Sequence, residues 1–369
     1  MLNIFRRISI LQKLKPFQPK KVSVRNTFRD LLRSFSTSHK FQNMKIGTHD
    51  GVFHCDEVLA CVMLQMLPEY KDAEIVRSRD KNILNGCDIV LDVGAVFDHD
   101  KKCYDHHQRE FTGTLSSLRP EFGDKYNIKL SSAGLIYTFY GEAILEHFFK
   151  NLDFKSSDKK LIFRKVYENF IQEIDAIDNG VPMTESEPRY KIHTHLSNRI
   201  GRLNPEWNSK QEIEVFDLFK KAMSLAREEF LYCVNYLINI WYCARDYVRV
   251  GFENRLQVDP SGEIIVFTER FPWKEHLYDL ESDLGLEGTI KYVIFIDKPG
   301  SWRVQAVAVS YSSFTTRKPL NPKWWGVRDE QLSGIANIEG CTFCHSNGFI
   351  GGNTTKEGAI KMAVASLNA

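Results

Sequence analysis

The chain of 369 residues lacks any apolar run long enough to cross a membrane. A membrane-spanning helix needs about 20 consecutive apolar residues, and the most apolar segment here, residues 237–242, is far shorter. We therefore predict no membrane partner. Hydrophobic residues make up 43% of the chain and charged residues 26%, which are ordinary proportions for a globular protein.

Cysteine is present but follows no regular spacing, which excludes a small disulfide-stapled domain. The eight cysteines are Cys55, Cys61, Cys87, Cys103, Cys233, Cys243, Cys341 and Cys344. Their scatter favours reduced thiols inside a cell. Residues 341–345 read C-x-x-C-H, the pattern of a c-type haem attachment site. A redox pair or half of a zinc site would also fit this pattern, but no other feature of the sequence supports these alternatives.

Acidic residues are nearly missing from residues 1–43, where Asp30 stands among ten lysines and arginines. An Arg-rich, Ser-bearing and acid-poor start is typical of a mitochondrial transit peptide. Residues 33–38, RSFSTS, also resemble the R-x-F-x-x-S pattern found near matrix-processing sites. We expect residues 1–43 to direct the protein to the mitochondrial matrix; the alternative is a basic arm that binds nucleic acid. A start at Met44 would give a leaderless form in the nucleus or cytoplasm.

The rest of the chain is acidic, with 39 basic and 46 acidic residues. Any contact with nucleic acid must therefore come from a local basic patch and not from the net charge. The length allows two domains after the first segment. We predict one domain over residues 44–250, ending in a helical connector, and a smaller one over residues 251–369.

Hydrophobic periodicity predicts an α/β fold with a mostly parallel sheet flanked by helices. The expected strands of the first domain are residues 45–48, 73–76 and 88–93, and the expected helices are residues 57–67, 132–149 and 161–177. Residues 211–244 form a long helical stretch whose aromatic residues indicate core packing more than base stacking. The second domain reads as α+β, with strands at 264–267, 292–296 and 303–309 and a helix at 355–367.

Histidines and acidic residues gather where the predicted strands end, and ligands of parallel sheets bind beyond these carboxyl ends. The residues in question are His49, Asp50, His54 and Asp56 after the first strand, Asp92 at the end of the third, Asp105, His106 and His107 after a short turn, and Asp175 and Asp178 near a helix end. Arg77 and Arg79 follow the second strand and are candidates to hold phosphate oxygens.

Clusters rich in carboxylate and histidine suit hard or borderline divalent metals such as Mn²⁺ and Mg²⁺, and also Zn²⁺ or Co²⁺. There are enough ligands for two ions about 3.5–4 Å apart, the arrangement used for displacement at phosphorus. A carboxylate that bridges two ions is best placed at a rigid strand end, which favours Asp92.

Several motifs stand in the order found in the DHH phosphoesterases: HxxxxHxDE (49–57), VLDVG (90–94), DHH (105–107) and a later acidic helix end. Longer segments resemble the MYG (melanocyte proliferating gene) branch: THDGVFHCDEVLA, VRSRD, YDHHQREF, LSSAGLIY, EIDAIDNG and WRVQAV. The resemblance covers nearly everything from Lys45 onward. It implies a DHH-type catalytic domain, a smaller substrate-binding domain, and a metal-dependent hydrolase that removes nucleotides from the 3′ end of RNA in mitochondria and nucleus.

The resemblance also implies roles for individual residues. The metal ligands would be His49, His54, Asp56, the bridging Asp92, His106 and one of Asp175 and Asp178. His107 would face the phosphate, and Asp105 would orient its neighbours. The first motif departs from the usual H-x-x-x-D-x-D, because His54 lies next to the positions where that spacing places carboxylates, so Asp50 and Glu57 stay open as alternative ligands.

The substrate side is expected in the last part of the chain. Gly351 and Gly352 precede the final helix, where free N–H groups of a glycine-rich loop favour an anion. By resemblance, His345, both glycines and Asn353 would grip the end of the substrate. Arg303 is a further candidate, beside Arg77 and Arg79, to hold phosphate oxygens. RNA is the expected partner, no protein partner is predicted, and the oligomeric state stays open. The alternatives are a hydrolase of small phosphates and a non-catalytic scaffold that binds metal or RNA.

Overall fold

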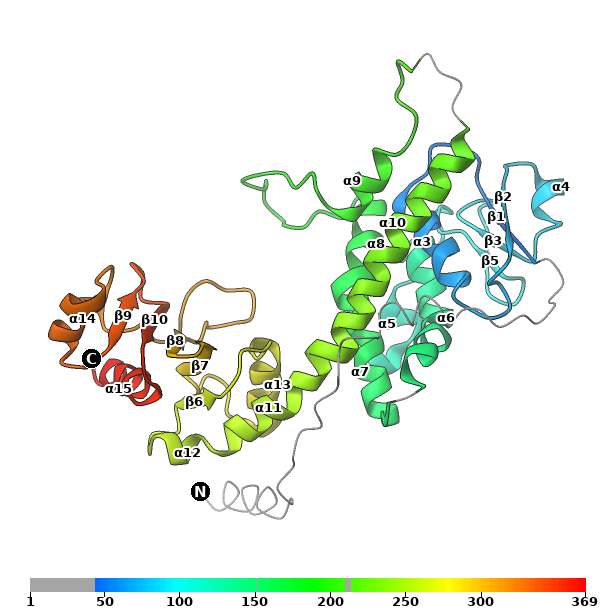
Figure 1. Ribbon diagram of the computed structural model, residues 1–369. Helices are drawn as coiled ribbons and strands as arrows, with labels where there is room; N and C mark the ends of the chain where they lie inside the picture. Colours follow the sequence, from blue (N-terminus) through cyan, green and yellow to red (C-terminus); the bar gives the residue numbers. More distant parts are fainter. Residues whose placement is uncertain (1–43, 151, 210–213) are drawn as a thin grey trace. The chain divides into compact units, whose positions relative to one another are not determined.

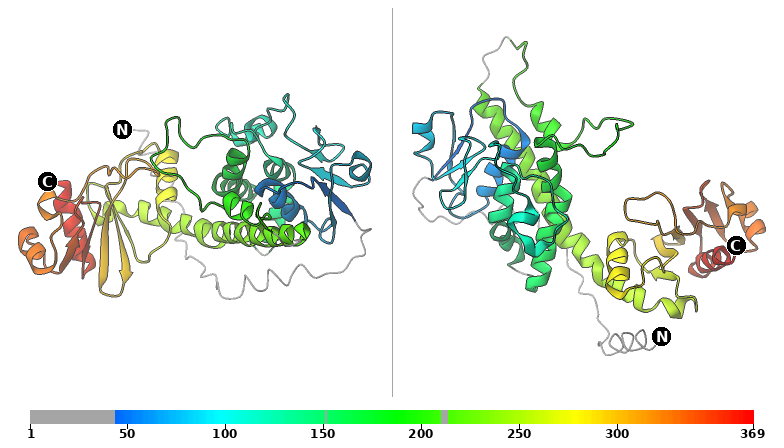
Figure 2. Two further views of the ribbon diagram at one scale, coloured as in Figure 1. Left: turned by 90° about the horizontal axis from the view of Figure 1, so that it is seen from above. Right: turned by 180° about the vertical axis from the view of Figure 1, so that it is seen from behind.

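The computed structural model describes residues 44–150, 152–209 and 214–369, so the expected transit peptide lies outside the described residues (Figures 1 and 2). The described chain divides between Leu237 and Ile238 into two compact units, here called the first and the second unit. The expected division was at residues 250 and 251. The difference arises because helix α11 (Tyr242–Glu253) contributes Val248 and Phe252 to a core of the second unit.

The first unit contains a five-stranded sheet in the order β2-β1-β3-β5-β4. All neighbouring strands are parallel except β4 and β5, which confirms the predicted α/β fold with a mostly parallel sheet. The strands are β1 (Lys45–Thr48), β2 (Glu74–Arg77), β3 (Ile89–Leu91), β4 (Phe97–Asp98) and β5 (Cys103–Tyr104). Strand β3, of sequence IVL, is apolar throughout, which fits a strand in the interior of a parallel sheet.

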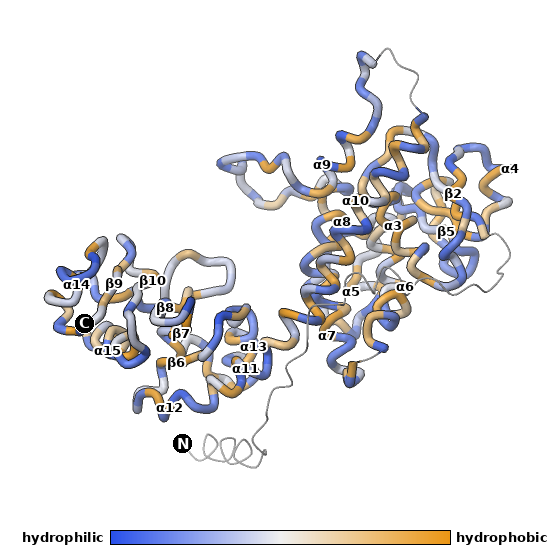
Figure 3. The backbone as a smooth tube through the Cα atoms, viewed as in Figure 1, coloured by the Kyte–Doolittle hydropathy of each residue, from blue (hydrophilic) through white to orange (hydrophobic). Residues whose placement is uncertain are grey.

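The helices of this unit are α3 (Cys55–Leu64), α4 (Lys81–Leu84), α5 (Leu115–Leu118), α6 (Ser132–Phe149), α7 (Ser156–Val166), α8 (Gln172–Asp178), α9 (Leu196–Gly201) and α10 (Val215–Tyr236), with a 3-10 turn at Pro120–Phe122 and a π-helical turn at Tyr167–Ile171. Most of them lie on one side of the sheet, and the short helix α4 lies on the other (Figure 1). All residues of α3 are buried, and α3 packs against α6 and α10. Helix α10 is amphipathic, with apolar and polar residues alternating along it (Figure 3).

Helix α6 has the predicted bounds, whereas the helix predicted at 161–177 begins earlier and is divided by the π-helical turn into α7 and α8. A π-helical turn appears mostly as a single turn inside an α-helix, and the sequence prediction of one continuous helix did not include it. Within the described ranges, no helix combines the length and apolarity that a bilayer crossing requires.

The second unit contains a mixed five-stranded sheet in the order β6-β7-β8-β10-β9. Only β6 and β7 are parallel. The strands are β6 (Ile264–Phe267), β7 (Tyr292–Lys298), β8 (Ser301–Ala306), β9 (Cys341–Cys344) and β10 (Ile350–Asn353), and the helices are α11, α12 (Arg255–Val258), α13 (Lys274–Leu284), α14 (Asp329–Ala336) and α15 (Lys356–Leu367), with a π-helical turn at Leu237–Trp241 and a 3-10 turn at Pro322–Trp324. Cys341 and Cys344 are buried in the core between this sheet and α15, a position that suits packing.

Candidate metal centre

Two neighbouring parallel strands deliver the first members of the site. His49 directly follows β1 and Asp92 directly follows β3, and the two strands pair in parallel, so their carboxyl ends lie side by side. Asp92 has φ 56°, a left-handed conformation that residues other than glycine rarely adopt. His49 Nε2 is 3.4 Å from Asp92 Oδ2. The turn after β3 thus directs the Asp92 carboxylate towards the histidine of the next strand.

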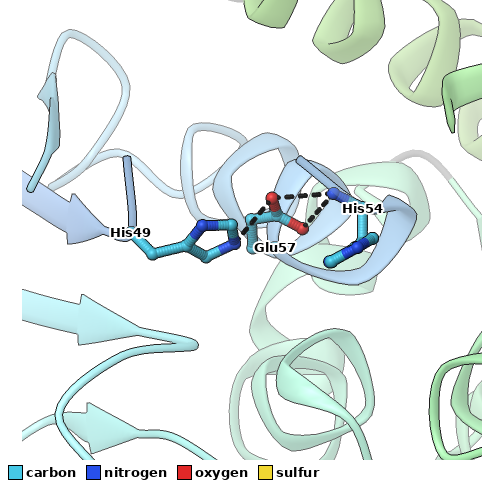
Figure 4. A group of neighbouring side chains, drawn as sticks. All are labelled: His49, His54 and Glu57. Atoms are coloured by element: carbon cyan, nitrogen blue, oxygen red, sulfur yellow. Dashed lines mark hydrogen bonds and ion pairs between the residues drawn. The ribbon is translucent and has the colours of Figure 1, made fainter. Parts of the chain in front are cut away.

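His49, His54 and Glu57 form one group of candidate ligand atoms, all within 4.8 Å of one another (Figure 4). Glu57 Oε1 lies 3.1 Å from His49 Nε2. Both oxygens of Glu57 also accept the backbone N–H of His54, at 2.9 and 3.0 Å, because Glu57 is the third residue of α3 and His54 is its N-cap. Of the two alternative ligands left open by the sequence, the structure places Glu57 in the group. Asp50 instead pairs with Arg79 at 3.3 Å.

His106 brings a second group together. Its Nε2 is 3.1 Å from Asp178 Oδ2, 3.3 Å from Asp92 Oδ1 and 3.8 Å from Asp56 Oδ2. Candidate ligand atoms of Asp56, His106 and Asp178 lie within 4.8 Å of one another, as do those of Asp92, His106 and His107. Asp92 therefore stands between the His49 side and the His106 side, the position that a bridging carboxylate requires.

We call the whole set the histidine–carboxylate cluster. Its members are His49, His54, Asp56, Glu57, Asp92, His106, His107 and Asp178. Asp56, Glu57 and Asp92 are buried with candidate ligand atoms within 4.8 Å of one another, and like charges held this close in a low-dielectric site repel strongly. Asp56 Oδ1 is buried and has no hydrogen-bond partner among the described residues. A divalent cation would offset the repulsion and coordinate this oxygen, so the cluster could hold metal.

The carboxylates perturb the histidines strongly. Burial alone would lower the pKa of His49, but hydrogen bonds to Asp92 and Glu57 raise it to about 9. The pKa of His106 is likewise raised to about 9, because contacts with Asp178 and Asp92 outweigh burial. Burial and the nearby Asp92 and Asp178 carboxylates raise the pKa of Asp56. The pKa of Asp92 is lowered, since His106 and His49 outweigh the effect of burial. The cluster therefore holds protons where a metal would otherwise supply positive charge.

Asp105 and His107 form an oriented pair beside the cluster. Asp105 is buried, and its Oδ1 lies 2.8 Å from His107 Nδ1 and accepts the His107 backbone N–H at 3.1 Å. Its Oδ2 accepts the N–H of Ala95 at 2.6 Å. Both Asp105 oxygens are thus committed to orienting the chain and the ring, while the His107 side chain is 62% exposed and can meet a substrate.

The structure separates the two acidic residues at the end of α8. Asp178 belongs to the cluster, but Asp175 does not. Asp175 is fully buried, and its Oδ1 accepts both the N–H and the hydroxyl of Ser131, at 3.0 and 2.7 Å. Burial raises the pKa of Asp175 to about 7. The sequence left open which of the two would join the metal ligands. The geometry places Asp178 in the cluster and gives Asp175 a contact with the start of α6.

The two arginines after β2 have different surroundings. Arg77 donates to the carbonyl oxygens of His49 at 3.1 Å and Gly51 at 2.5 Å, and its guanidinium lies over the ring of Phe219. Arg77 therefore holds the loop that carries His49, and its predicted contact with phosphate stays a prediction. Arg79 is 63% exposed and makes an ion pair with Asp50, so its charge can face a substrate.

The predicted glycine-rich loop of the second unit is a strand. Gly351 and Gly352 lie inside β10, paired with β8 and β9, and α15 begins only at Lys356. A Cβ atom on Gly352 would come within 2.5 Å of the Thr342 hydroxyl and 3.0 Å of Arg303 Nη1. These glycines therefore allow close strand packing. The expected loop at the helix start is a strand, and a contact of the two glycines with substrate stays a prediction.

The other predicted substrate residues of this unit are partly committed to internal bonds. Asn353 is buried; its Oδ1 accepts the Thr355 N–H at 2.8 Å and its Nδ2 donates to the Glu339 carbonyl at 2.9 Å, so it fixes the turn before α15. Arg303 pairs with Asp297 at 2.9 Å and lies over the ring of Phe343. His345 is exposed, with Nδ1 2.8 Å from Asn347 Oδ1. Arg303 and His345 remain accessible candidates within this unit.

Sequence reasoning missed residues that act on the cluster from a distance. Asn204, after α9, accepts the N–H of Phe53 at 3.0 Å and donates to its carbonyl at 2.8 Å, which fixes the loop before His54. No local pattern marks Asn204. The start of α6 contacts the cluster through Ser132. Glu57 did carry a signal, because an acidic residue three positions after a helix N-cap has the spacing of a capping box.

Comparisons with known proteins show the family to which the chain is similar. The family model MYG1_exonuc, described as an uncharacterised protein family (UPF0160), matches residues 45–367. The chain is 50% identical over 333 residues to "MYG1 exonuclease" of Bos taurus, which covers 89% of this chain and 86% of the relative. It is 49% identical over 326 residues to "MYG1 exonuclease" of Homo sapiens, covering 88% and 85%. The "MYG1 protein" of Dictyostelium discoideum is 46% identical over 329 residues, covering 88% and 97%.

The family model spans both units, and the segments around His49, Asp92 and the two adjacent histidines lie inside the matched range. Because these relatives are close to half identical over most of their length, the chain belongs to the MYG1 family.

Proposed function

We propose that this protein is a divalent-metal-dependent phosphodiesterase that removes nucleotides from the 3′ end of RNA, built on a DHH-type catalytic domain. The observation that carries the proposal is the Asp92 carboxylate, which lies 3.4 Å from His49 Nε2 on one side and 3.3 Å from His106 Nε2 on the other. This arrangement suits two ions that share one carboxylate. The name "MYG1 exonuclease" of the mammalian relatives supports a nuclease.

Two sets of side chains would hold the ions. His49, His54, Glu57 and Asp92 make up one set, and Asp56, Asp92, His106 and Asp178 make up the other. Their carboxylate-rich composition favours Mn²⁺ or Mg²⁺. Bound ions would supply the activation of the attacking water and the neutralisation of charge on the phosphoryl group.

The chain's own residues position the substrate. His107 is exposed beside Asp92 and is oriented by Asp105, so we assign it to a non-bridging phosphate oxygen of the scissile group. Arg79 is the exposed cation at the His49 loop, and we assign it to the phosphate backbone of the RNA. In the second unit, Arg303 and His345 are the residues we assign to the RNA chain.

The experiment uses full-length protein and RNA labelled at the 5′ end, with Mn²⁺, with Mg²⁺ or with EDTA. The expected result is a ladder of shortened products that retain the label, with no shortening in EDTA. Faster release of phosphate from pyrophosphate than shortening of RNA would assign the site to small phosphates. RNA binding without hydrolysis under every divalent metal would leave a scaffold and contradict the proposal.

We also propose that residues 1–43 direct the protein to the mitochondrial matrix, on the strength of their ten basic residues and single acid. A fluorescent fusion of the full chain should co-localise with a matrix marker, and a fusion begun at Met44 should not. Equal distribution of the two fusions would contradict the targeting role.

A further inference from the structure

The first turn of helix α6 is held between α8 and the histidine–carboxylate cluster. Ser131 is the N-cap of α6. Asp175 on α8 accepts two hydrogen bonds from Ser131, through the backbone N–H at 3.0 Å and the hydroxyl at 2.7 Å. The side chains of both residues are fully buried. The start of α6 is therefore fixed at one defined place relative to α8.

The next residue, Ser132, contacts two carboxylates of the cluster. Its backbone N–H donates to Asp56 Oδ2 at 3.3 Å. Its hydroxyl lies 3.1 Å from Asp92 Oδ1 and 3.1 Å from the Tyr104 carbonyl oxygen, so one hydroxyl proton serves both acceptors. Ser132 is fully buried and makes no contact with solvent. One serine thus links Asp56 and the central Asp92.

Gly134 makes this approach of α6 to α8 feasible. A Cβ atom at Gly134 would lie 2.2 Å from Asp175 Oδ1 and 2.5 Å from Oδ2. Any side chain there would push Asp175 and α6 apart. The same helix α8 ends at Asp178, whose Oδ2 lies 3.1 Å from His106 Nε2. Displacement of α8 from α6 would therefore move a cluster member as well.

We propose that Ser132 is a positioning residue for the metal centre and that Asp175 keeps Ser132 in place through Ser131. The proposal rests on the metal-binding part of the proposed function. A carboxylate whose orientation is fixed by a hydrogen bond keeps defined oxygen atoms for the ion, and loss of such a partner typically costs about 10–100-fold in metal affinity. The alternative is that Ser132 only fills the first turn of a helix, in which case metal affinity should not depend on its hydroxyl.

The test is calorimetric titration of metal-free, full-length protein with Mn²⁺ alone. Ser132→Ala removes the hydroxyl but keeps the N-cap Ser131, and we expect the Mn²⁺ affinity to fall by about 10–100-fold. Thr138→Val is the matched control, because Thr138 is a buried residue of the same helix whose hydroxyl donates to the Gly134 carbonyl and, within the described part of the chain, to no other group. The Mn²⁺ affinity of this control variant should equal that of the wild type. Mn²⁺ affinity of Ser132→Ala within about 2-fold of the wild type overturns the role of Ser132.

Asp175 supplies a second, independent pair of variants. Asp175→Asn keeps an amide oxygen for the two Ser131 donors and should bind Mn²⁺ nearly as well as the wild type, whereas Asp175→Ala should bind it about 10-fold more weakly or worse. Equal affinity of Asp175→Ala and the wild type overturns the anchoring role. Failure of the wild type itself to bind any divalent metal would instead reject the proposed function, so the two failures are distinguishable.

Saturating metal gives a further readout. If Ser132 acts by positioning the carboxylates, high Mn²⁺ should bring the RNA cleavage rate of Ser132→Ala close to that of the wild type. A rate that stays low although the Mn²⁺ sites are filled would show a role other than metal affinity and would contradict the proposal.

Discussion

The carboxylate of Asp92 lies between two histidine rings, with Oδ2 3.4 Å from His49 Nε2 and Oδ1 3.3 Å from His106 Nε2. The two histidines come from separate segments of the sheet, one after β1 and one after β5. Asp92 is therefore the one residue that both candidate metal positions share, and each ring raises the acidity of its carboxyl group.

Asp92→Asn tests this shared position. Asparagine accepts the left-handed backbone conformation, with φ 56° at this position, so the variant should fold. The amide lacks the negative charge that two ions would share, and we expect RNA cleavage to fall by more than about 100-fold, beyond the usual loss for an outer partner. Initial rates measure the loss, and circular dichroism controls for folding. Activity within about 10-fold of the wild type would contradict the bridging assignment.

Glu57→Gln and Asp50→Asn form a matched pair of variants. Asp50 lies in the loop before α3, and Glu57 lies in the first turn of α3. Glu57 lies 3.1 Å from His49 Nε2, whereas Asp50 is exposed and pairs with Arg79. We expect Glu57→Gln to retain about one ion per chain where the wild type holds about two, and Asp50→Asn to retain both. Metal content per chain, measured by mass spectrometry after gel filtration, tests this difference between the two variants. Loss of an ion from Asp50→Asn alone would reverse the assignment.

Metal binding should release protons. His49 and His106 have pKa values raised to about 9, above the ordinary value near 6.5, so the fold stabilises their protonated forms. In metal-free protein this stabilisation is full below about pH 6.5 and is lost as the pH rises through about 9. A metal ligand must be a neutral imidazole, so Mn²⁺ displaces protons at pH values between these limits, and its affinity should rise with pH across this range.

Calorimetry in two buffers with different ionisation enthalpies measures this release. The difference in apparent binding enthalpy, divided by the difference in ionisation enthalpy of the two buffers, gives the number of protons released, which should be roughly one to two. Equal enthalpies in both buffers would show that the two histidines are already neutral in the metal-free protein.

Arg77→Ala and Arg79→Ala should affect different properties. Arg77 donates to the His49 and Gly51 carbonyls, so its loss should lower the free energy of unfolding by about 1–3 kcal/mol. Arg79 is 63% exposed, and its loss should change stability by less than about 0.5 kcal/mol but raise KM for RNA. Urea denaturation and steady-state kinetics measure the two effects. A large rise in KM with unchanged stability for Arg77→Ala would support its predicted phosphate role.

Asn204→Ala should loosen the loop before His54. The side chain bonds to both the N–H and the carbonyl of Phe53, at 3.0 and 2.8 Å. Without it, amide hydrogen exchange in residues 50–55 should speed up, and stability should fall by about 1–3 kcal/mol. Asn208→Ala, an exposed position on the same segment, is the control and should exchange like the wild type. Unchanged exchange in Asn204→Ala would show that the loop is held by other contacts.

The sequence predicted the parts of the site that depend on short-range order. His49 and Asp92 follow buried strands, and the carboxyl ends of parallel strands meet at one edge, so their proximity could be inferred without coordinates. Helix α6 was predicted with its observed bounds because a pair of serines precedes a long apolar stretch, and the structure shows that Ser131 is the N-cap.

The remaining features depend on contacts between distant residues. Asp175 and Asp178 are three residues apart on α8, and periodicity places both on one face; only the approach of Ser131 on α6 separates their roles. Likewise, a glycine pair before a helix suits a loop as well as a strand, and the pairing of β10 with both β8 and β9 decided between them. No local sequence pattern indicated that Arg77 would donate hydrogen bonds to two carbonyls of the neighbouring loop.

Hydrogen bonds hold the segment from His49 to Glu57 along its length. Arg77 donates to two of its carbonyl oxygens, Asn204 donates to the Phe53 carbonyl, and Glu57 accepts the His54 N–H. Surface loops usually tolerate insertions and deletions, because few of their backbone groups are committed. Here one added or deleted residue would break at least one of these attachments and shift His49 against α3. Among natural relatives that retain the cluster, this segment should therefore vary in residue type but keep a constant length.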